Sequence, residues 1–155
     1  MGGQAMTQWI MAVDPGKTSG LALYDRTAES FESFELDFDR TCSTALENAQ
    51  SKGTDLLIVC ESFLITQQTP KNTQAPWSLE LIGVMRFLSR TYCGRDITLQ
   101  APASAKRFSS DERLRSMGFW TRGKGHANDA ARHLLLTLAG RGWLDHSVLV
   151  TLAET

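Results

Sequence analysis

The alternation of apolar and polar residues along the chain predicts five short strands. They cover residues 9–13, 19–24, 30–38, 55–60 and 96–100. Only short gaps separate the first three, as in an antiparallel meander. The fourth (DLLIVC) is a continuous apolar run, which is typical of a central strand that is buried on both faces.

Helical spacing fills most of the remaining chain. The predicted helices are 41–52, 77–92, two short helices within 103–118, and 127–139. A polar, proline-containing loop covers 67–76, and a flexible connector covers 121–125. We therefore expect one α/β domain over 1–155. Its mixed five-stranded sheet has three antiparallel strands followed by two parallel ones, and helices flank it.

Composition narrows the class of protein. The 155-residue chain is 42% hydrophobic and 21% charged, as in ordinary globular domains. No apolar run approaches the roughly 18 residues that span a membrane, and the first residues show no secretory signal pattern.

Cys42, Cys60 and Cys93 form no C-x-x-C pair, so we expect three reduced thiols in a cytoplasmic protein. The four tryptophans follow no pattern, and we assign them to packing.

The net charge of −1 hides an uneven distribution. Residues 1–85 carry 5 Lys and Arg against 11 Asp and Glu, whereas residues 86–124 carry 9 against 3. A basic segment in an acidic chain suits a protein that places a polyanion beside a carboxylate site. Charge alone is also compatible with a solvated polar face, and by itself favours that interpretation.

Two carboxylates end predicted buried strands. Asp14 follows the first strand in the context V-D-P-G-K-T-S-G, where Pro15 and Gly16 turn the chain sharply. Glu61 ends the fourth strand. If these strands are neighbours, both acids project from one edge of the sheet, and a divalent cation relieves their repulsion. Taken singly, Asp14 can be a turn cap and Glu61 a surface acid in a salt bridge.

A third candidate segment, G-H-A-N-D-A-A-R-H, opens the last predicted helix. His126 and Asp129 are three residues apart and share a helix face, and His133 lies one turn deeper. A single His–Asp pair is more often a helix-start cap than a pair of ligands. Three acids and one imidazole brought together by one fold favour Mg²⁺ or Mn²⁺ over Zn²⁺.

The Gly16-Lys17-Thr18 sequence is not a nucleotide-binding loop. The phosphate-binding loop requires a second glycine five residues before the first residue of this triplet, and Met11 stands there. We therefore expect no nucleotide cofactor.

Three motifs together resemble the RuvC-type Holliday junction resolvases. They are D-P-G-x-x-x-G on a first strand, a glutamate that closes a later apolar strand, and H-x-x-D-A at the start of a final helix. The resemblance spans roughly residues 9–140, and the segment 63–77 looks like the compact phage versions of the family. The resemblance implies an RNase H-like fold. It also implies a protein that acts in the cytoplasm of a bacterial or phage-infected cell.

The same resemblance implies a reaction and a site. Four residues would act as catalytic ligands for two Mg²⁺ or Mn²⁺ ions: Asp14, Glu61, His126 and Asp129. The implied reaction is two-metal hydrolysis of a phosphodiester bond, with a four-way DNA junction as substrate. Symmetric cutting of a junction implies a homodimer.

Candidate nucleic-acid contacts lie between and beside these motifs. Lys106, Arg107, Arg122 and Lys124 precede the H-x-x-D helix, where they can hold phosphates. Phe63 follows Glu61 closely and can stack on bases near the cut. The competing interpretations are solvated side chains for the cations and a core position for Phe63.

The sequence therefore predicts a metal-dependent endonuclease for branched DNA, most specifically a Holliday junction resolvase. Two alternatives remain open. One is a nuclease of the same fold that acts on other branched DNA or on RNA/DNA hybrids. The other is a nucleic-acid-binding module that keeps the fold without catalysis.

Overall fold

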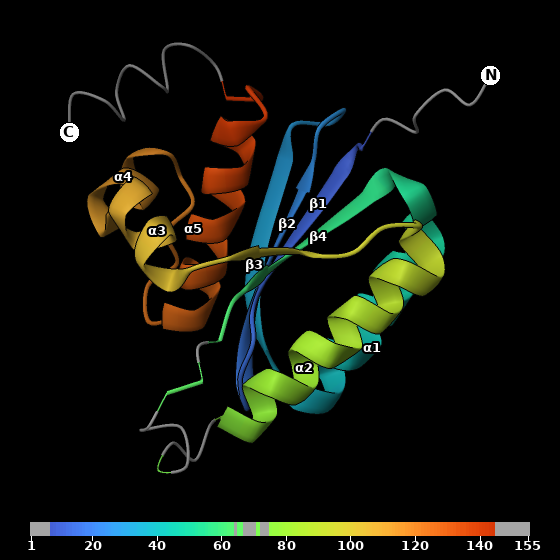
Figure 1. The fold of residues 1–155 in the computed structure, drawn as a ribbon. Helices are drawn as coiled ribbons and strands as arrows, with labels where there is room; N and C mark the ends of the chain where they lie inside the picture. The colour runs from blue at the N-terminus through green and yellow to red at the C-terminus, as the bar shows by residue number, and fades with distance from the viewer. Residues whose placement is uncertain (1–6, 64, 67–70, 72–74, 145–155) are drawn as a thin grey trace.

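A five-stranded mixed sheet forms the centre of the molecule (Figure 1). The computed structural model describes residues 7–63, 65–66, 71 and 75–144. The strands are β1 (Trp9–Asp14), β2 (Thr18–Asp25), β3 (Ser30–Asp37), β4 (Leu56–Glu61) and β5 (Thr98–Gln100), in the order β3-β2-β1-β4-β5. β1, β2 and β3 pair antiparallel, whereas β4 and β5 continue the sheet in parallel pairing. The predicted sheet is confirmed.

Helices cover both faces of this sheet. They are α1 (Phe38–Lys52), α2 (Ala75–Leu88), α3 (Pro102–Phe108), α4 (Asp111–Ser116) and α5 (Gly125–Gly140). Figure 1 shows α1 and α2 side by side on one face, α5 on the other, and α3 and α4 beyond α5. The predicted pair of short helices within 103–118 is thereby confirmed.

Several helix boundaries differ from the predicted ones, and the largest differences are at the start of α1 and the end of α2. α1 begins at Phe38 instead of residue 41, because the Asp37 carboxylate caps it by accepting the Arg40 N–H at 2.8 Å. α2 ends at Leu88 and passes into a π-helical turn, Ser89–Cys93, within the predicted range 77–92. Most of the predicted loop 67–76 lies outside the described residues.

The central strand β1 contributes to two separate cores. Met11 and Val13 pack toward α1 and α2, whereas Ile10 and Ala12 pack toward α5. All four are at most 1% exposed. Side chains alternate between the faces of a strand, so a strand that is covered on both sides must be apolar throughout. This explains why the sequence of β1 is an unbroken apolar run that ends at a carboxylate.

The three cysteines are free thiols, as predicted. None of the described helices combines the length and the apolar character needed to cross a bilayer.

Candidate active site

Asp14 occupies the end of β1, where the chain turns away from the sheet. The residue is only 8% exposed. The turn after it is closed by the Ser19 hydroxyl, which accepts the Gly16 N–H at 3.1 Å and donates to the Gly16 carbonyl at 3.2 Å. The carboxylate is therefore held in a fixed, largely desolvated position at the edge of the sheet.

Glu61 lies at the same edge, as predicted. β1 and β4 are parallel neighbours with Val13 opposite Cys60, so the next residue of each strand is one of the two acids. Burial raises the pKa of Asp14 to about 6, and the negative charges of Glu61 and Asp129 add to this effect. A hydrogen bond with His126 opposes it in part. Glu61 and Asp129 are thus each close enough to Asp14 to act electrostatically on its carboxylate.

Helix α5 brings the third motif to this edge. His126 Nδ1 lies 3.0 Å from Asp14 Oδ2, and the His126 side chain is 52% exposed. The close approach depends on Gly20 in β2, because a Cβ there would lie only 1.8 Å from the His126 carbonyl oxygen. Glycine at this position is therefore a steric requirement for docking the start of α5 on the sheet.

Asp129 is hydrogen-bonded to Arg132 and not to another residue of the three motifs. Its Oδ1 accepts a hydrogen bond from Arg132 Nη1 at 2.6 Å. Arg132, only 7% exposed, also donates through Nε to the Ser109 carbonyl at 2.9 Å and pairs with Asp111. In this arrangement no group of three or more His, Cys, Asp or Glu side chains among the described residues is close enough to hold a metal ion.

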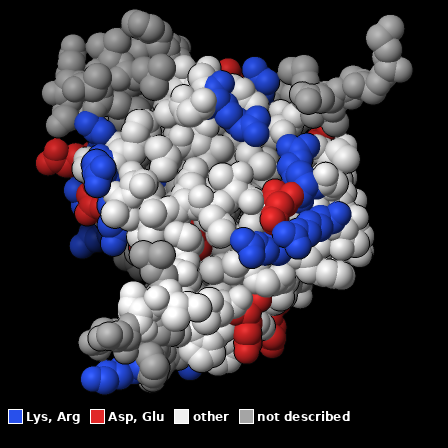
Figure 2. Space-filling view, viewed as in Figure 1, with Lys and Arg blue, Asp and Glu red and all other residues white. Residues whose placement is uncertain are grey.

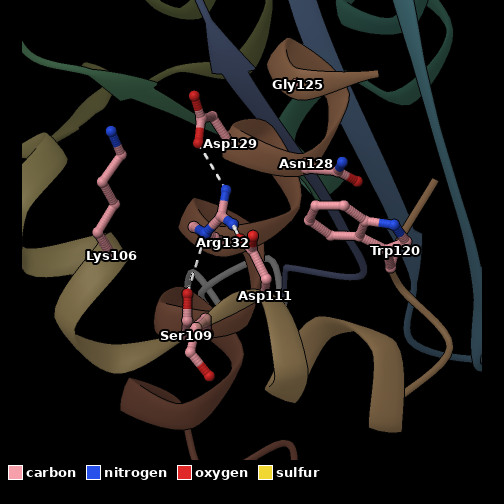
Figure 3. Close-up of a pocket in the computed structure, with 9 residues that line it drawn as sticks. Lys106, Ser109, Asp111, Trp120, Gly125, Asn128, Asp129 and Arg132 are labelled. Carbon is pink, nitrogen blue, oxygen red and sulfur yellow. Dashed lines mark hydrogen bonds and ion pairs between the residues drawn. The ribbon is translucent and has the colours of Figure 1, made fainter. Parts of the chain in front are cut away.

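An open pocket of about 400 Å³ adjoins Asp129 (Figure 3). Its walls come from the α3–α4 junction, from Trp120 and from the first turns of α5. Lys106 projects toward the same opening as Asp129, from the other side (Figure 3). A volume of this size admits a small ligand such as one nucleotide unit. Trp120, which the sequence analysis left to packing, is therefore also a wall of this pocket.

The predicted phosphate-binding residues lie on the α5 side of the sheet. Lys106 and Arg107 are exposed on α3, and Arg122 and Lys124 are exposed on the connector before α5. That connector is tied at its start, since the Asn128 side chain makes two hydrogen bonds of 2.9 Å with the backbone of Thr121. Only Lys106 among these four lines the pocket.

The basic segment 86–124 is divided between two places in the fold. Arg86 near the end of α2 and Arg90 in the π-helical turn after it pair with Asp96 at 3.7 and 2.7 Å. Figure 2 shows one mixed group of charges beside α2 and another over α3 and α4, with largely uncharged surface between them. The segment is therefore not one continuous basic field. Phe63 is half-buried just after β4, which leaves both of its interpretations open.

Two residues near the site were missed by sequence reasoning. Glu35 on β3 accepts the His126 N–H at 3.0 Å and caps the start of α5, where Lys124 supplies no side-chain cap. His133 contacts Glu61 through Nε2 at 2.8 Å. For His133 a signal was present, because its spacing from Asp129 places it one turn further along the same helix face. For Glu35, in an ordinary half-exposed strand, there was none.

Comparison with known proteins supports the fold. No family model matches the sequence, and no curated protein matches it either. The structure matches that of T. thermophilus RuvC in complex with a Holliday junction substrate, with a TM-score of 0.61 and 14% identity. This match covers 88% of the chain and 97% of RuvC. A Fowlpox virus resolvase, solved with its Holliday junction DNA, matches over 84% and 97% with a TM-score of 0.44 and 15% identity.

The likeness to RuvC confirms the predicted fold class. The chain has an RNase H-like α/β fold, and its three antiparallel and two parallel strands follow the predicted order. The resemblance first seen in three short motifs thus extends to the arrangement of the whole described chain.

Proposed function

We propose that this protein is a metal-dependent endonuclease that cuts branched DNA, with the four-way junction as its substrate. The observation that carries the proposal is the buried carboxylate of Asp14 at the edge of the sheet, where Glu61 and Asp129 help raise its pKa to about 6. Acids concentrated in this way are characteristic of catalytic sites. The shared fold with RuvC, which was solved with a Holliday junction substrate, supports the choice of substrate.

We further propose that the site holds two Mg²⁺ or Mn²⁺ ions through Asp14, Glu61, His126 and Asp129. The donor set fits these ions, because carboxylate oxygens with one imidazole suit hard divalent cations. A cation would also offset the desolvation of Asp14 and its repulsion by Glu61 and Asp129, which together raise the pKa of Asp14. Binding at Asp129 requires its carboxylate to exchange Arg132 for the ion. Bound ions would supply an activated water and would stabilise charge on the leaving oxygen.

The chain's own residues orient the reacting groups in this proposal. Asp14 is fixed by the turn after β1, and His126 Nδ1 is held on its carboxylate. The other ring nitrogen, Nε2, makes no hydrogen bond with a described residue, and the side chain is half exposed. We propose that this nitrogen faces the attacking water or an ion. Lys106, across the pocket from Asp129, would hold a phosphate of the cut strand.

A cleavage assay with several DNA shapes tests the proposal. End-labelled four-way, Y-shaped and linear DNA and an RNA/DNA hybrid are each incubated with the protein and Mg²⁺. We expect paired nicks in the four-way junction, with 5′-phosphate and 3′-hydroxyl ends, and none with EDTA. Preferred cutting of the hybrid would favour the other nuclease, and tight junction binding without any cutting would favour the silent module. Equal cutting of linear DNA would contradict junction specificity.

We also propose that two copies of the chain form a symmetric dimer through α2. Leu79 and Phe87 on this helix are 40% and 63% exposed, and the space over Gly83 is open. Leu79 and Phe87 each lie four residues from Gly83, and Glu80 and Arg86 each lie three. An antiparallel pair of α2 helices that cross at Gly83 therefore sets Leu79 against the partner's Phe87 and Glu80 against the partner's Arg86. The surface is complementary to itself, as a twofold interface requires.

The dimer has its own test. Phe87→Glu should convert the protein to a monomer in analytical ultracentrifugation, because it places two carboxylates in an apolar contact. Leu46→Glu, at an exposed apolar position on α1, is the matched control and should leave the mass unchanged. A monomeric wild-type protein at micromolar concentration, or a Phe87→Glu variant that still dimerises, would contradict this interface.

A further inference from the structure

His133 is buried between α5 and the edge of the sheet, and both of its ring nitrogens are engaged. It is 1% exposed. Nε2 lies 2.8 Å from Glu61 Oε2, and Nδ1 lies 3.0 Å from Gln100 Oε1. Gln100 Nε2 in turn donates to the Thr137 hydroxyl at 2.8 Å, and that hydroxyl donates to the His133 carbonyl at 3.0 Å. The imidazole ring is therefore locked in one orientation by residues of β4, β5 and α5.

The chemistry of the contact sets its direction. An ionised carboxylate has no hydrogen to donate, so with Glu61 ionised His133 Nε2 carries a proton and donates it to Oε2. The Gln100 amide oxygen is also only an acceptor, so the hydrogen bond at Nδ1 requires a proton on that nitrogen as well. Hydrogen bonds to a charged acceptor are stronger than neutral ones, and the low exposure of His133 limits competition from water. Oε2 of Glu61 is therefore already hydrogen-bonded within the protein, by His133.

We propose that His133 is a positioning residue for Glu61. By holding Oε2 it leaves Oε1 as the oxygen that faces the reaction centre beside Asp14. Glu61 is the last residue of β4 and its side chain is 22% exposed, so its carboxylate reaches solvent and this contact restricts its orientation. The inference rests on the proposed function, in which Glu61 binds an ion.

The spacing along α5 supports the assignment. His126 contacts Asp14 at the end of β1, and His133, about two helical turns further on, contacts Glu61 at the end of the neighbouring strand. One helix therefore holds both strand-end acids through imidazoles. Carboxylates that bind metal ions are commonly oriented by hydrogen-bond partners outside the ligand set, and mutation of such partners typically lowers metal affinity or activity by about 10–100-fold.

The test compares three substitutions in the full-length protein. His133→Leu fills the site without a donor, His133→Gln places an amide nitrogen near the position of Nε2, and His133→Asn places one near Nδ1. For each, Mn²⁺ affinity is measured by electron paramagnetic resonance, and single-turnover cleavage and junction Kd are measured separately. We expect Leu and Asn to weaken Mn²⁺ binding and to slow cleavage by about 10–100-fold. His133→Gln should stay within a few-fold of wild type, and junction Kd should not change in any variant.

Controls separate positioning from a general loss of packing. Leu134→Val, at the adjacent buried position of α5, should lower the Tm without changing Mn²⁺ affinity. Folding is monitored by circular dichroism, and if His133→Leu does not fold, the Gln and Asn pair decides the question. Equal Mn²⁺ affinity and cleavage rate in folded Gln and Asn variants would overturn the inference. A wild-type protein that binds Mn²⁺ but cuts no junction would instead contradict the proposed function, and the Mn²⁺ affinities would still decide the role of His133.

Discussion

The two faces of the sheet differ in what their helices contribute. On the α1–α2 face, side chains such as Met11 and Met85 form an apolar core along the strands. On the α5 face the core is equally apolar in its middle, where Ile10 meets the helix. There the polar chemistry begins at one end, where α5 passes the last residues of β1 and β4.

This difference shows how a small fold separates stability from chemistry. The α1–α2 layer can be apolar because it contributes no candidate ligand. The α5 layer must pack against the sheet and also present His126, Asp129 and His133 to two strand-end acids. Desolvation of charged groups costs free energy, and here that cost is concentrated around Asp14.

The largest effect is expected from neutralising the three acids of the candidate site. Asp14→Asn, Glu61→Gln and Asp129→Asn should each reduce junction cleavage by roughly 1000-fold or more, because amides keep the shape but lose the charge that binds ions. Junction binding, measured by gel shift in EDTA, should survive. Glu47→Gln, at an exposed position on α1, is the control and should cut at the wild-type rate. Appreciable nicking by any of the three site variants would contradict the assignment.

A smaller effect is expected when α5 is lifted from the sheet. Gly20→Ala should lower the free energy of unfolding by about 3 kcal/mol, because the new methyl group collides with backbone at His126. Gly140→Ala, where a Cβ meets nothing within 4 Å, is the matched control and should not destabilise the protein. Urea unfolding followed by circular dichroism measures both. Equal stability of the two variants would mean that α5 does not approach β2 this closely.

The raised pKa of Asp14 predicts a pH-dependent cost to stability. Between its ordinary value of 3.8 and about 6 the unfolded chain loses this proton while the folded chain keeps it, so stability falls as pH rises through this window. Asp14→Asn removes the cost, and in EDTA at pH 7.5 it should stabilise the protein by about 3 kcal/mol, since the pKa is raised from 3.8 to about 6 and one pKa unit corresponds to about 1.4 kcal/mol.

At pH 4 the same substitution should give almost no gain. The control is Asp39→Asn in the first turn of α1, which should show no such pH-dependent gain. A gain of the same size at both pH values would show that it does not come from the ionisation of Asp14.

The smallest expected effect concerns the cations on the α5 side. Replacing Lys106, Arg107, Arg122 and Lys124 with Gln should weaken junction binding and flatten its salt dependence, because each lost phosphate contact removes close to one released counterion. The control is the double variant Arg40→Gln/Lys52→Gln on α1, which should leave the slope of junction affinity against salt concentration unchanged. Because it removes two charges and the test variant removes four, the change in slope is compared per charge removed. Parallel salt lines for the fourfold variant and wild type would assign these residues to a solvated surface.

The elements of the fold were predictable because their signals are local. An unbroken apolar run ending in Asp14, and another ending in Glu61, follow directly from strands that are buried on both faces. The spacing of His126 and Asp129 follows from helical periodicity. These patterns depend on neighbours along the chain, so the strands, their succession along the chain and the three motifs could be recognised without coordinates. That β4 lies beside β1 was only a condition of the prediction, and the structure established it.

Contacts between distant segments could not be predicted in the same way. The capping of α5 by Glu35 joins residues 91 positions apart, and the contact of His133 with Glu61 joins residues 72 apart. Nothing local to Glu35 marks such a partner, and the helical spacing of His133 from Asp129 does not identify Glu61 as its partner. The division of the basic segment between α2 and α3 likewise depends on β5, which carries the chain across the sheet between them.

The amino-acid sequence was sufficient to establish which residues are apolar enough to be strands and which acids stand at their ends. The folded structure established the partner of each acid, with His126 on Asp14, His133 on Glu61 and Arg132 on Asp129. The physical reason is that burial and periodicity are properties of a local segment. The position of a hydrogen bond depends instead on how a helix and a sheet pack. Here that packing is possible because Gly20 has no side chain to collide with the backbone of His126.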